Sequence, residues 1–395
     1  MKKKYAFVSI SAAFGILVSI LLCEAFVRTF PPAWLQHRMT TLNPDASAAG
    51  FGSDRAWKVE RRDGKFLRFK PGTKFDVSHY EYANVAHIDD LGGRRVAHNR
   101  EAQVEVPNLI VPFLGDSFTF GVGVEDEETF ASLLSSKLGG VRIVNLGVPG
   151  TAIHNQLDII RLRYAEFGRP SRVVFFFFLG NDFANIRNAV RSDETELNRK
   201  PLGQTVANKS SPNFLSHING FVYHNTVLKQ SYLIQFLRKF ALEFYIADRK
   251  RQNKKFVGDP IFIIMNQDDE RQYLEATKDL VGQFKRLKAM EKELGFSSLL
   301  ITIPDVHQID ETKRKLQAAV YGIAFRSLDS NRPNRLVEMA ASKENLLFFD
   351  STHCLSSSGL GAKLYYTQDN HLRAIGHELL ANCIEERLKL FVQGL

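Results

Sequence analysis

The chain has 395 residues, with 52 lysines and arginines against 43 aspartates and glutamates, which gives a formal net charge of +9 at pH 7. Hydrophobic residues make up 44% and charged residues 24% of the sequence, an ordinary globular composition that excludes a wholly disordered chain. This length accommodates one large domain with insertions, or two domains. Because the basic excess comes without any nucleic-acid-binding signature, we expect no nucleic-acid partner.

An uncharged apolar segment follows a basic N-terminus. Three lysines at positions 2–4 precede Tyr5–Cys23, which as a helix would extend roughly 28 Å, close to the thickness of a bilayer core. We therefore expect residues 1–4 in the cytoplasm, a transmembrane signal anchor over residues 5–27, and a periplasmic body attached to the inner membrane. A cleaved signal peptide is the alternative, but small residues are poorly placed for cleavage after the apolar segment.

The chain contains three cysteines, Cys23, Cys354 and Cys383. The last two either form a disulfide in an oxidising compartment or remain free thiols, and the sequence leaves both alternatives open. No CxxC or HExxH pattern occurs, so the sequence indicates no metal site.

A repeating pattern of strands and helices begins near residue 106. Before it, residues 28–105 predict a β-leaning lead-in with short segments such as Lys65–Phe69 between glycines and prolines. The predicted strands are Leu109–Leu114, Val141–Leu146, Arg172–Leu179, Ser297–Ile303 and Leu346–Phe349. The predicted helices are Glu125–Lys137, Pro149–Phe167, Gln308–Leu328 and His371–Phe391. Apolar strands that alternate with helices predict a parallel sheet covered on both faces, here a three-layer α/β/α flavodoxin-like domain over residues 106–395.

A long insertion, about residues 185–290, separates the third strand from the fourth. Its middle, Phe221–Tyr245, mixes aromatic residues with lysine and arginine at near-helical spacing. This pattern predicts a helix, which either packs on the domain or serves as a lid or an interfacial helix near the bilayer.

Four short motifs lie at the ends of predicted strands or just before the final helix. They are GDS at 115–117, NLG at 145–147, GND at 180–182 and DNH at 369–371. Open α/β sheets bind ligands beyond the carboxyl ends of their strands. We therefore expect the four motifs to meet at one edge of the sheet.

These motifs supply the parts of a nucleophilic site. A serine hydroxyl is a weak nucleophile until a base accepts its proton, and the base needs a third group to fix its tautomer. Ser117 is the candidate nucleophile, His371 the base and Asp369 the orienting carboxylate. The backbone N–H groups of Ser117 and Gly147 and the side-chain amide of Asn181 are the candidate oxyanion donors. Gly147 has no Cβ, which we expect to let a substrate approach its backbone.

This set resembles the SGNH (GDSL-type) hydrolase superfamily, which is named for its Ser, Gly, Asn and His residues. The resemblance covers about residues 108–185 and 295–390, and it implies the roles just given for the five residues. Phe118 replaces the Leu of the first motif. One residue separates Asp369 from His371 where many members have two, a spacing that looks like O-acetyltransferase-related branches acting on extracellular polysaccharides.

Other polar residues near the motifs have structural or reserve roles. Asp305 and Asp350, at strand ends, are the alternative carboxylates for the base. Asp116 is expected to order the nucleophile loop, and Asp182 to be a loop or cap residue. His377 lies inside the final helix and is expected to be structural.

The sequence therefore predicts a serine esterase or acyl hydrolase that acts on an extracytoplasmic small-molecule or glycan ester and needs neither metal nor organic cofactor. An O-acyltransferase that moves an acetyl group to an envelope glycan uses the same residues and stays open. A membrane-tethered glycan-binding or assembly module with a vestigial site is the non-enzymatic alternative. An α/β-hydrolase is disfavoured, because residues 115–119 lack the second glycine of G-x-S-x-G.

Overall fold

The computed structural model describes residues 2–32, 59–79, 81–97, 109–197, 230–237, 259–367 and 369–394, together with residues 35, 39 and 228. By its internal contacts the chain divides into two compact units. The first unit contains Met1–Ala48, Ser78–Tyr82 and Thr205–Phe256. The second contains Ala49–Val77, Ala83–Gln204 and Val257–Leu395, and with them all four motifs.

In the first unit, the helix α1 (Lys2–Thr29) includes the N-terminal apolar segment. Near its end, the Glu24 carboxylate accepts the Ser231 hydroxyl at 2.7 Å and the N–H of Leu233 at 2.9 Å. Within the described ranges, no helix combines the length and apolar character that crossing a bilayer requires. The transmembrane anchor expected over residues 5–27 stays a prediction.

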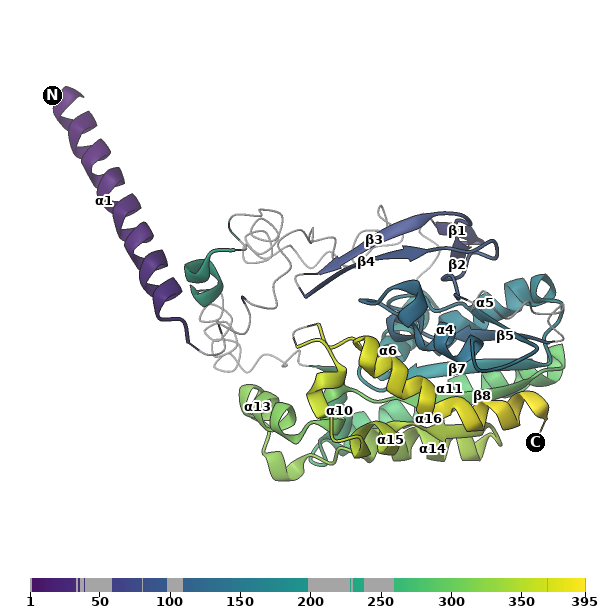
Figure 1. Cartoon of the computed structure of the whole chain (residues 1–395). Coiled ribbons are helices and arrows are strands. Elements are labelled where there is room, and N and C mark those ends of the chain that lie inside the picture. The colour runs from purple at the N-terminus through teal and green to yellow at the C-terminus, as the bar shows by residue number, and fades with distance from the viewer. Residues whose placement is uncertain are drawn as a thin grey trace. The chain divides into compact units, whose positions relative to one another are not determined.

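The second unit is built on a five-stranded parallel sheet (Figure 1) with the order β6-β5-β7-β8-β9. The strands are β5 (Leu109–Leu114), β6 (Val141–Asn145), β7 (Arg172–Phe178), β8 (Ser297–Ile303) and β9 (Leu347–Asp350). Counted along the chain, this order is 2-1-3-4-5, which is the flavodoxin-like arrangement. The predicted fold class is confirmed, and each strand lies where a strand was predicted.

Two helical layers cover the sheet, because successive side chains of a strand point to opposite faces. On one face, Phe113, Phe176 and Ile301 are buried in a core shared with α4 (Phe130–Ser135) and α16 (Ala374–Gln393). Burying each such side chain contributes about 1.5–3 kcal/mol. This core holds the C-terminal helix against the strand that precedes the nucleophile.

The opposite face carries α5 (Ile153–Arg163), α11 (Glu270–Leu294) and α14 (Arg332–Lys343). Phe177 of β7 meets Phe284 of α11 edge-on, with ring centroids 6.5 Å apart. Because α11 packs against both α5 and α14, the three helices form one layer. The sequence pattern did not indicate α14.

The predicted helix Glu125–Lys137 is divided. A 3-10 turn, η1 (Asp126–Glu128), is followed by α4, because Thr129 caps α4 by accepting the N–H of Ser132. The predicted helices Pro149–Phe167 and His371–Phe391 begin later than expected, as α5 and α16.

The predicted helix Gln308–Leu328 is likewise interrupted. It consists of α12 (Val306–Ile309), α13 (Glu311–Tyr321) and a 3-10 turn, η3 (Phe325–Ser327). The break falls at Asp310, whose carboxylate accepts the N–H of Lys313 at 2.7 Å and so starts a new helix.

The long insertion is described only in part. Its described helices are α6 (Asp182–Leu197), α10 (Pro260–Met265) and most of α11, together with a helical segment at 232–237. Most of the predicted helix Phe221–Tyr245 lies outside the described residues.

The lead-in forms two small two-stranded sheets, as its β-leaning pattern predicted. One joins β1 (Val59–Arg62) to β2 (Lys65–Phe69), and the other joins β3 (Lys74–His79) to β4 (Tyr82–His87). Beyond β4, the backbone N–H of Arg94 donates to the Asn145 carbonyl at the end of β6. The lead-in thus reaches the strand end that carries the NLG motif.

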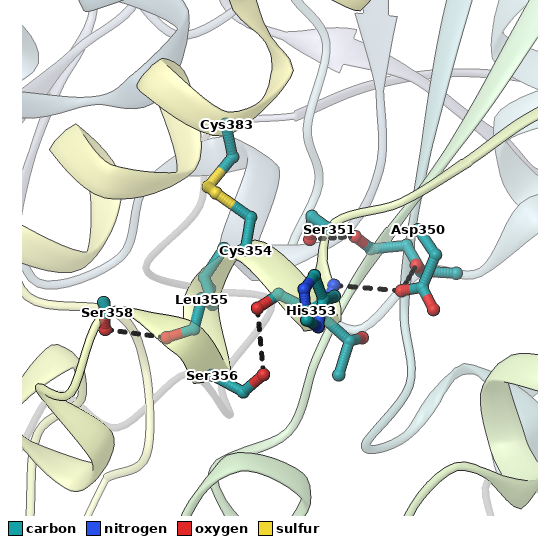
Figure 2. The surroundings of a disulfide bond; sticks show 10 residues. Asp350, Ser351, His353, Cys354, Leu355, Ser356, Ser358 and Cys383 are labelled. Atoms are coloured by element: carbon teal, nitrogen blue, oxygen red, sulfur yellow. Dashed lines mark hydrogen bonds between the residues drawn. A yellow bond between two sulfur atoms is a disulfide. The ribbon is translucent and has the colours of Figure 1, made fainter.

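A disulfide joins two elements near the C-terminus (Figure 2). Cys354 of α15 (Thr352–Ser357) is bonded to Cys383 of α16, which is one of the two alternatives that the sequence left open. Because α15 directly follows β9, the bond ties the end of this strand to the last helix.

Arg94 holds the loop that follows the nucleophile turn. Its fully buried guanidinium donates from Nε to Asp126 at 2.9 Å, and from its terminal nitrogens to the carbonyls of Gly121 and Val124 at 2.7 Å each. Removing a buried arginine leaves such partners without donors, which is strongly destabilising.

We expect Arg94→Met to lower the free energy of unfolding by about 3–5 kcal/mol, because Asp126 and two carbonyls lose buried donors. Arg95 is the matched control, since its Nε lies 2.8 Å from the same carboxylate while its side chain is 46% exposed. Arg95→Met should cost about 0.2–1 kcal/mol. Urea denaturation measures both losses, and equal losses would contradict the role given to Arg94.

Candidate active site

Ser117 begins α3 (Ser117–Phe120), a single helical turn directly after β5. Asp116 caps this turn by accepting the N–H of Phe118 at 2.9 Å, as expected of a residue that orders the loop. The turn ends at Gly121, whose φ of 84° is a left-handed conformation that glycine adopts without strain. Ser117 is therefore held at the carboxyl end of a buried strand.

His371 lies within hydrogen-bond distance of both of its predicted partners. Its Nε2 is 2.8 Å from Oγ of Ser117, and its Nδ1 is 2.5 Å from Oδ2 of Asp369. The Phe118 ring lies beside the imidazole, with ring centroids 4.8 Å apart. The structure thus brings together a hydroxyl, a base and a carboxylate in the order that nucleophilic acyl transfer requires.

The close spacing of Asp369 and His371 depends on Asn370. Its φ of 62° is left-handed, a conformation that asparagine tolerates better than most residues. Lys313 donates to the Asn370 side chain at 3.3 Å, and the backbone N–H of Tyr366 donates to the His371 carbonyl at 2.8 Å. With Asn370 in this conformation, the side chains of Asp369 and His371 face each other.

Gly147 packs against the nucleophile turn. A Cβ at this position would lie 2.2 Å from the backbone nitrogen of Phe120, so close packing requires a glycine here. Its N–H donates to Oδ1 of Asn145 at 3.0 Å. In this structure the N–H is already engaged, and acting on an oxyanion requires it to share or exchange that bond.

Asn145 is a residue whose role the sequence analysis missed. Its side-chain amide donates to the Thr119 carbonyl at 2.7 Å while its oxygen accepts from Gly147, so it bridges two loops of the site. The available signal was a polar side chain at the last position of a buried strand.

Asn181 follows the end of β7 and directly precedes α6. Its Oδ1 is buried and has no hydrogen-bond partner in the part of the chain that the structure describes. No hydrogen bond to a described residue engages the backbone N–H of Ser117 either. The candidate oxyanion donors remain the backbone N–H of Ser117 and the Nδ2 amide of Asn181, because Oδ1 of Asn181 can only accept.

The two alternative carboxylates have other partners. Oδ1 of Asp305 is 2.7 Å from Nδ1 of His307, a buried pair that the sequence did not indicate. Asp350 accepts hydrogen bonds from Asn334 at 2.8 Å and from Thr302 at 2.9 Å. Both carboxylates thus stabilise other strand ends.

Two further carboxyl groups are buried beside the site. Burial raises the pKa of Asp116 to about 6. Burial, together with the nearby charge of Asp116, raises the pKa of Asp182 well above its usual range. Within the described ranges, no group of three or more His, Cys, Asp or Glu side chains is arranged to hold a metal ion.

His377 packs beneath the site from α16. Its Nδ1 accepts the N–H of Phe130 at 3.3 Å, and the two rings stack with centroids 5.7 Å apart. Burial lowers the pKa of His377 to about 3, and the charges of Arg94 and His371 act in the same direction. The imidazole is therefore neutral, in keeping with the structural role predicted for it.

No family model matches the chain, and no curated protein matches it. Among solved structures, the chain is similar to LAE5, an alpha/beta hydrolase enzyme from the metagenome of Lake Arreo, at 12% identity over 72% of this chain and 98% of that one, with a TM-score of 0.36. A mutant of Axe2, an acetyl-xylooligosaccharide esterase from Geobacillus, gives 13% identity over 71% and 94% of the two chains and a TM-score of 0.35. A member of the lipolytic protein G-D-S-L family from Veillonella parvula is 10% identical over 70% of this chain and 96% of that one, with a TM-score of 0.32. At these identities and scores, the similarity carries no inference about activity.

His377 should make stability depend on pH. Its pKa is lower in the folded chain than the value near 6.5 expected when unfolded, so protonation favours the unfolded chain and stability falls as the pH drops below about 6.5. We expect His377→Gln to reduce the loss of unfolding free energy between pH 6.5 and 4.5 by about 2 kcal/mol. The exposed His353 provides the control, and His353→Gln should follow the wild-type curve in denaturation at each pH. If the unfolding free energies of all three proteins changed equally with pH, the lowered pKa of His377 would be contradicted.

Proposed function

We propose that the protein is a serine esterase of the SGNH (GDSL) type, in which Ser117, His371 and Asp369 act as nucleophile, base and orienting acid. The observation that carries this proposal is the unbroken sequence of contacts through the imidazole, with 2.8 Å to the serine and 2.5 Å to the carboxylate. A serine that served only as a helix-capping residue would need no base and no carboxylate behind it.

The geometry supports a two-step acyl transfer. Oγ of Ser117 attacks the ester carbonyl while Nε2 of His371 accepts the hydroxyl proton. Asp369 accepts a hydrogen bond from Nδ1–H and stabilises the imidazolium without taking its proton. The imidazolium then protonates the departing alcohol and leaves an acyl-serine. Water, deprotonated by the same Nε2, attacks the acyl carbon. The bond from this carbon to Oγ then breaks, the imidazolium returns the proton to Oγ, and the carboxylic acid departs.

The carbonyl oxygen becomes negatively charged in each step and needs hydrogen-bond donors. The backbone N–H of Ser117 and the side-chain N–H₂ of Asn181 are the candidate donors, because no described residue engages the Ser117 N–H and Asn181 lies on the loop between β7 and α6. Gly147 contributes where its bond to Asn145 is shared. One such donor stabilises the transition state by about 2.7–4 kcal/mol.

We assign the substrate to small-molecule or glycan esters outside the cytoplasm. The Cys354–Cys383 disulfide supports this compartment, because disulfides persist mainly in oxidising environments. The basic N-terminus followed by an apolar segment agrees with export of the body. An acceptor hydroxyl in place of water in the second step would make the same residues a transferase, which product analysis distinguishes.

We expect Ser117→Ala and His371→Ala each to lower kcat for p-nitrophenyl acetate by at least about 10⁴-fold. The double variant should lose little more than either single one, because the two residues act as a unit. Ser136→Ala, at an exposed serine at the end of α4, is the control and should resemble wild type. A folded Ser117→Ala protein with a tenth or more of the wild-type rate would refute the nucleophile assignment.

Two aspartate-to-asparagine substitutions test which carboxylate orients the catalytic histidine. Asp369→Asn should lower kcat by about 10⁴-fold with little change in KM, because His371 then adopts the wrong tautomer. Asp305→Asn makes the same chemical change at the other aspartate–histidine pair, with His307, and should have a far smaller effect. The reverse order of effects would transfer the role to Asp305.

A further inference from the structure

Asp116 and Asp182 are buried carboxyl groups that the acyl-transfer steps do not use. They are 1% and 0% exposed, and they directly precede the nucleophile and directly follow Asn181. One oxygen of each is paired, because Asp116 accepts the N–H of Phe118 at 2.9 Å and Asp182 accepts the N–H of Phe178 at 3.1 Å. The other oxygens, Oδ2 of Asp116 and Oδ1 of Asp182, are buried without a hydrogen-bond partner among the described residues.

The two carboxyl groups are neighbours in space. They follow the adjacent parallel strands β5 and β7, in which Leu114, the last residue of β5, pairs with Phe175 in the middle of β7. The rings of Phe118 and Phe178, whose N–H groups hold the two carboxyls, stack with centroids 3.7 Å apart. The charge of Asp116 is also near enough to raise the pKa of Asp182.

Two ionised carboxylates in one buried site repel each other, and each would also carry an unpaired oxygen away from water. One proton removes both difficulties, because it neutralises one group and gives the two unpaired oxygens a shared hydrogen bond. Burial raises the pKa of both groups. The charge of Asp116 acts to raise the pKa of Asp182 as well, whereas the positive charge of His371 acts to lower that of Asp116. The proton therefore belongs on Asp182.

We propose that Asp182 is protonated at neutral pH and donates from Oδ1 to Oδ2 of Asp116, which ties the nucleophile loop to the loop of Asn181. Both are positioning residues, because the acyl-transfer steps require neither of them to take up or release a proton. The bond fixes Ser117 relative to a candidate oxyanion donor, and this consequence rests on the proposed function. The remaining negative charge, on Asp116, favours the imidazolium that His371 becomes during acyl transfer.

Infrared spectroscopy tests the shared proton without reference to activity. At pH 8, where unperturbed carboxyls are ionised, wild-type protein should show the C=O band of a protonated carboxylic acid, shifted in D₂O. The band should be absent from Asp182→Asn and retained in Asp76→Asn, which removes an exposed carboxyl on β3. A wild-type spectrum without the band, or a band that survives in Asp182→Asn, would overturn the proposal even in an active esterase.

Kinetics test the positioning role. Asp182→Asn keeps a donor where the proton lies, whereas Asp182→Leu, of similar volume, leaves Oδ2 of Asp116 unpaired. We expect kcat for p-nitrophenyl acetate to be at least about tenfold lower in Asp182→Leu than in Asp182→Asn, with similar KM. Equal kcat values in two folded variants would refute the positioning role. A wild-type protein that is inactive on esters would refute the proposed function instead, and the infrared band would still decide the shared proton.

Discussion

The hydrogen bond between Ser117 and His371 joins residues that are 254 positions apart in the chain, and every chemical role given to the site depends on it. The bond exists because β5 ends at the edge of the sheet where the loop before α16 also arrives. A core shared by the sheet, α4 and α16 fixes these ends to each other. The hydrophobic packing of one face of the sheet is thus what places a base beside a nucleophile.

Buried polar groups then fix the loops at that edge. Asn145 bridges Thr119 and Gly147, and Arg94 holds the carbonyls that follow the nucleophile turn. The proposed bond between the two buried carboxyls would add a third tie. Such networks rigidify a site only when every member has a partner, because an unpaired polar group in a buried site destabilises the fold. The polar residues around the hydroxyl therefore act together as one support.

The sequence predicts the sheet well because strands buried on both faces are continuous apolar segments, such as RVVFFFF at 172–178. The site residues could be named for the same reason, since each motif follows such a segment or precedes the last helix. Helix boundaries were less predictable, because a single capping side chain such as Asp310 divides one apolar pattern into two helices. The burial of Arg94 arises from contacts distant in sequence, such as that with Asp126, which no local pattern encodes.

Labelling with a fluorophosphonate probe tests the central claim most directly, because the probe reacts only with a serine that a neighbouring base has activated. Intact mass should increase by one phosphonyl group per chain, and peptide mapping should locate this group on Ser117. The label should be lost in Ser117→Ala and form much more slowly in His371→Gln. Folded wild-type protein that stays unlabelled, or that carries the label on a different serine, would contradict the account.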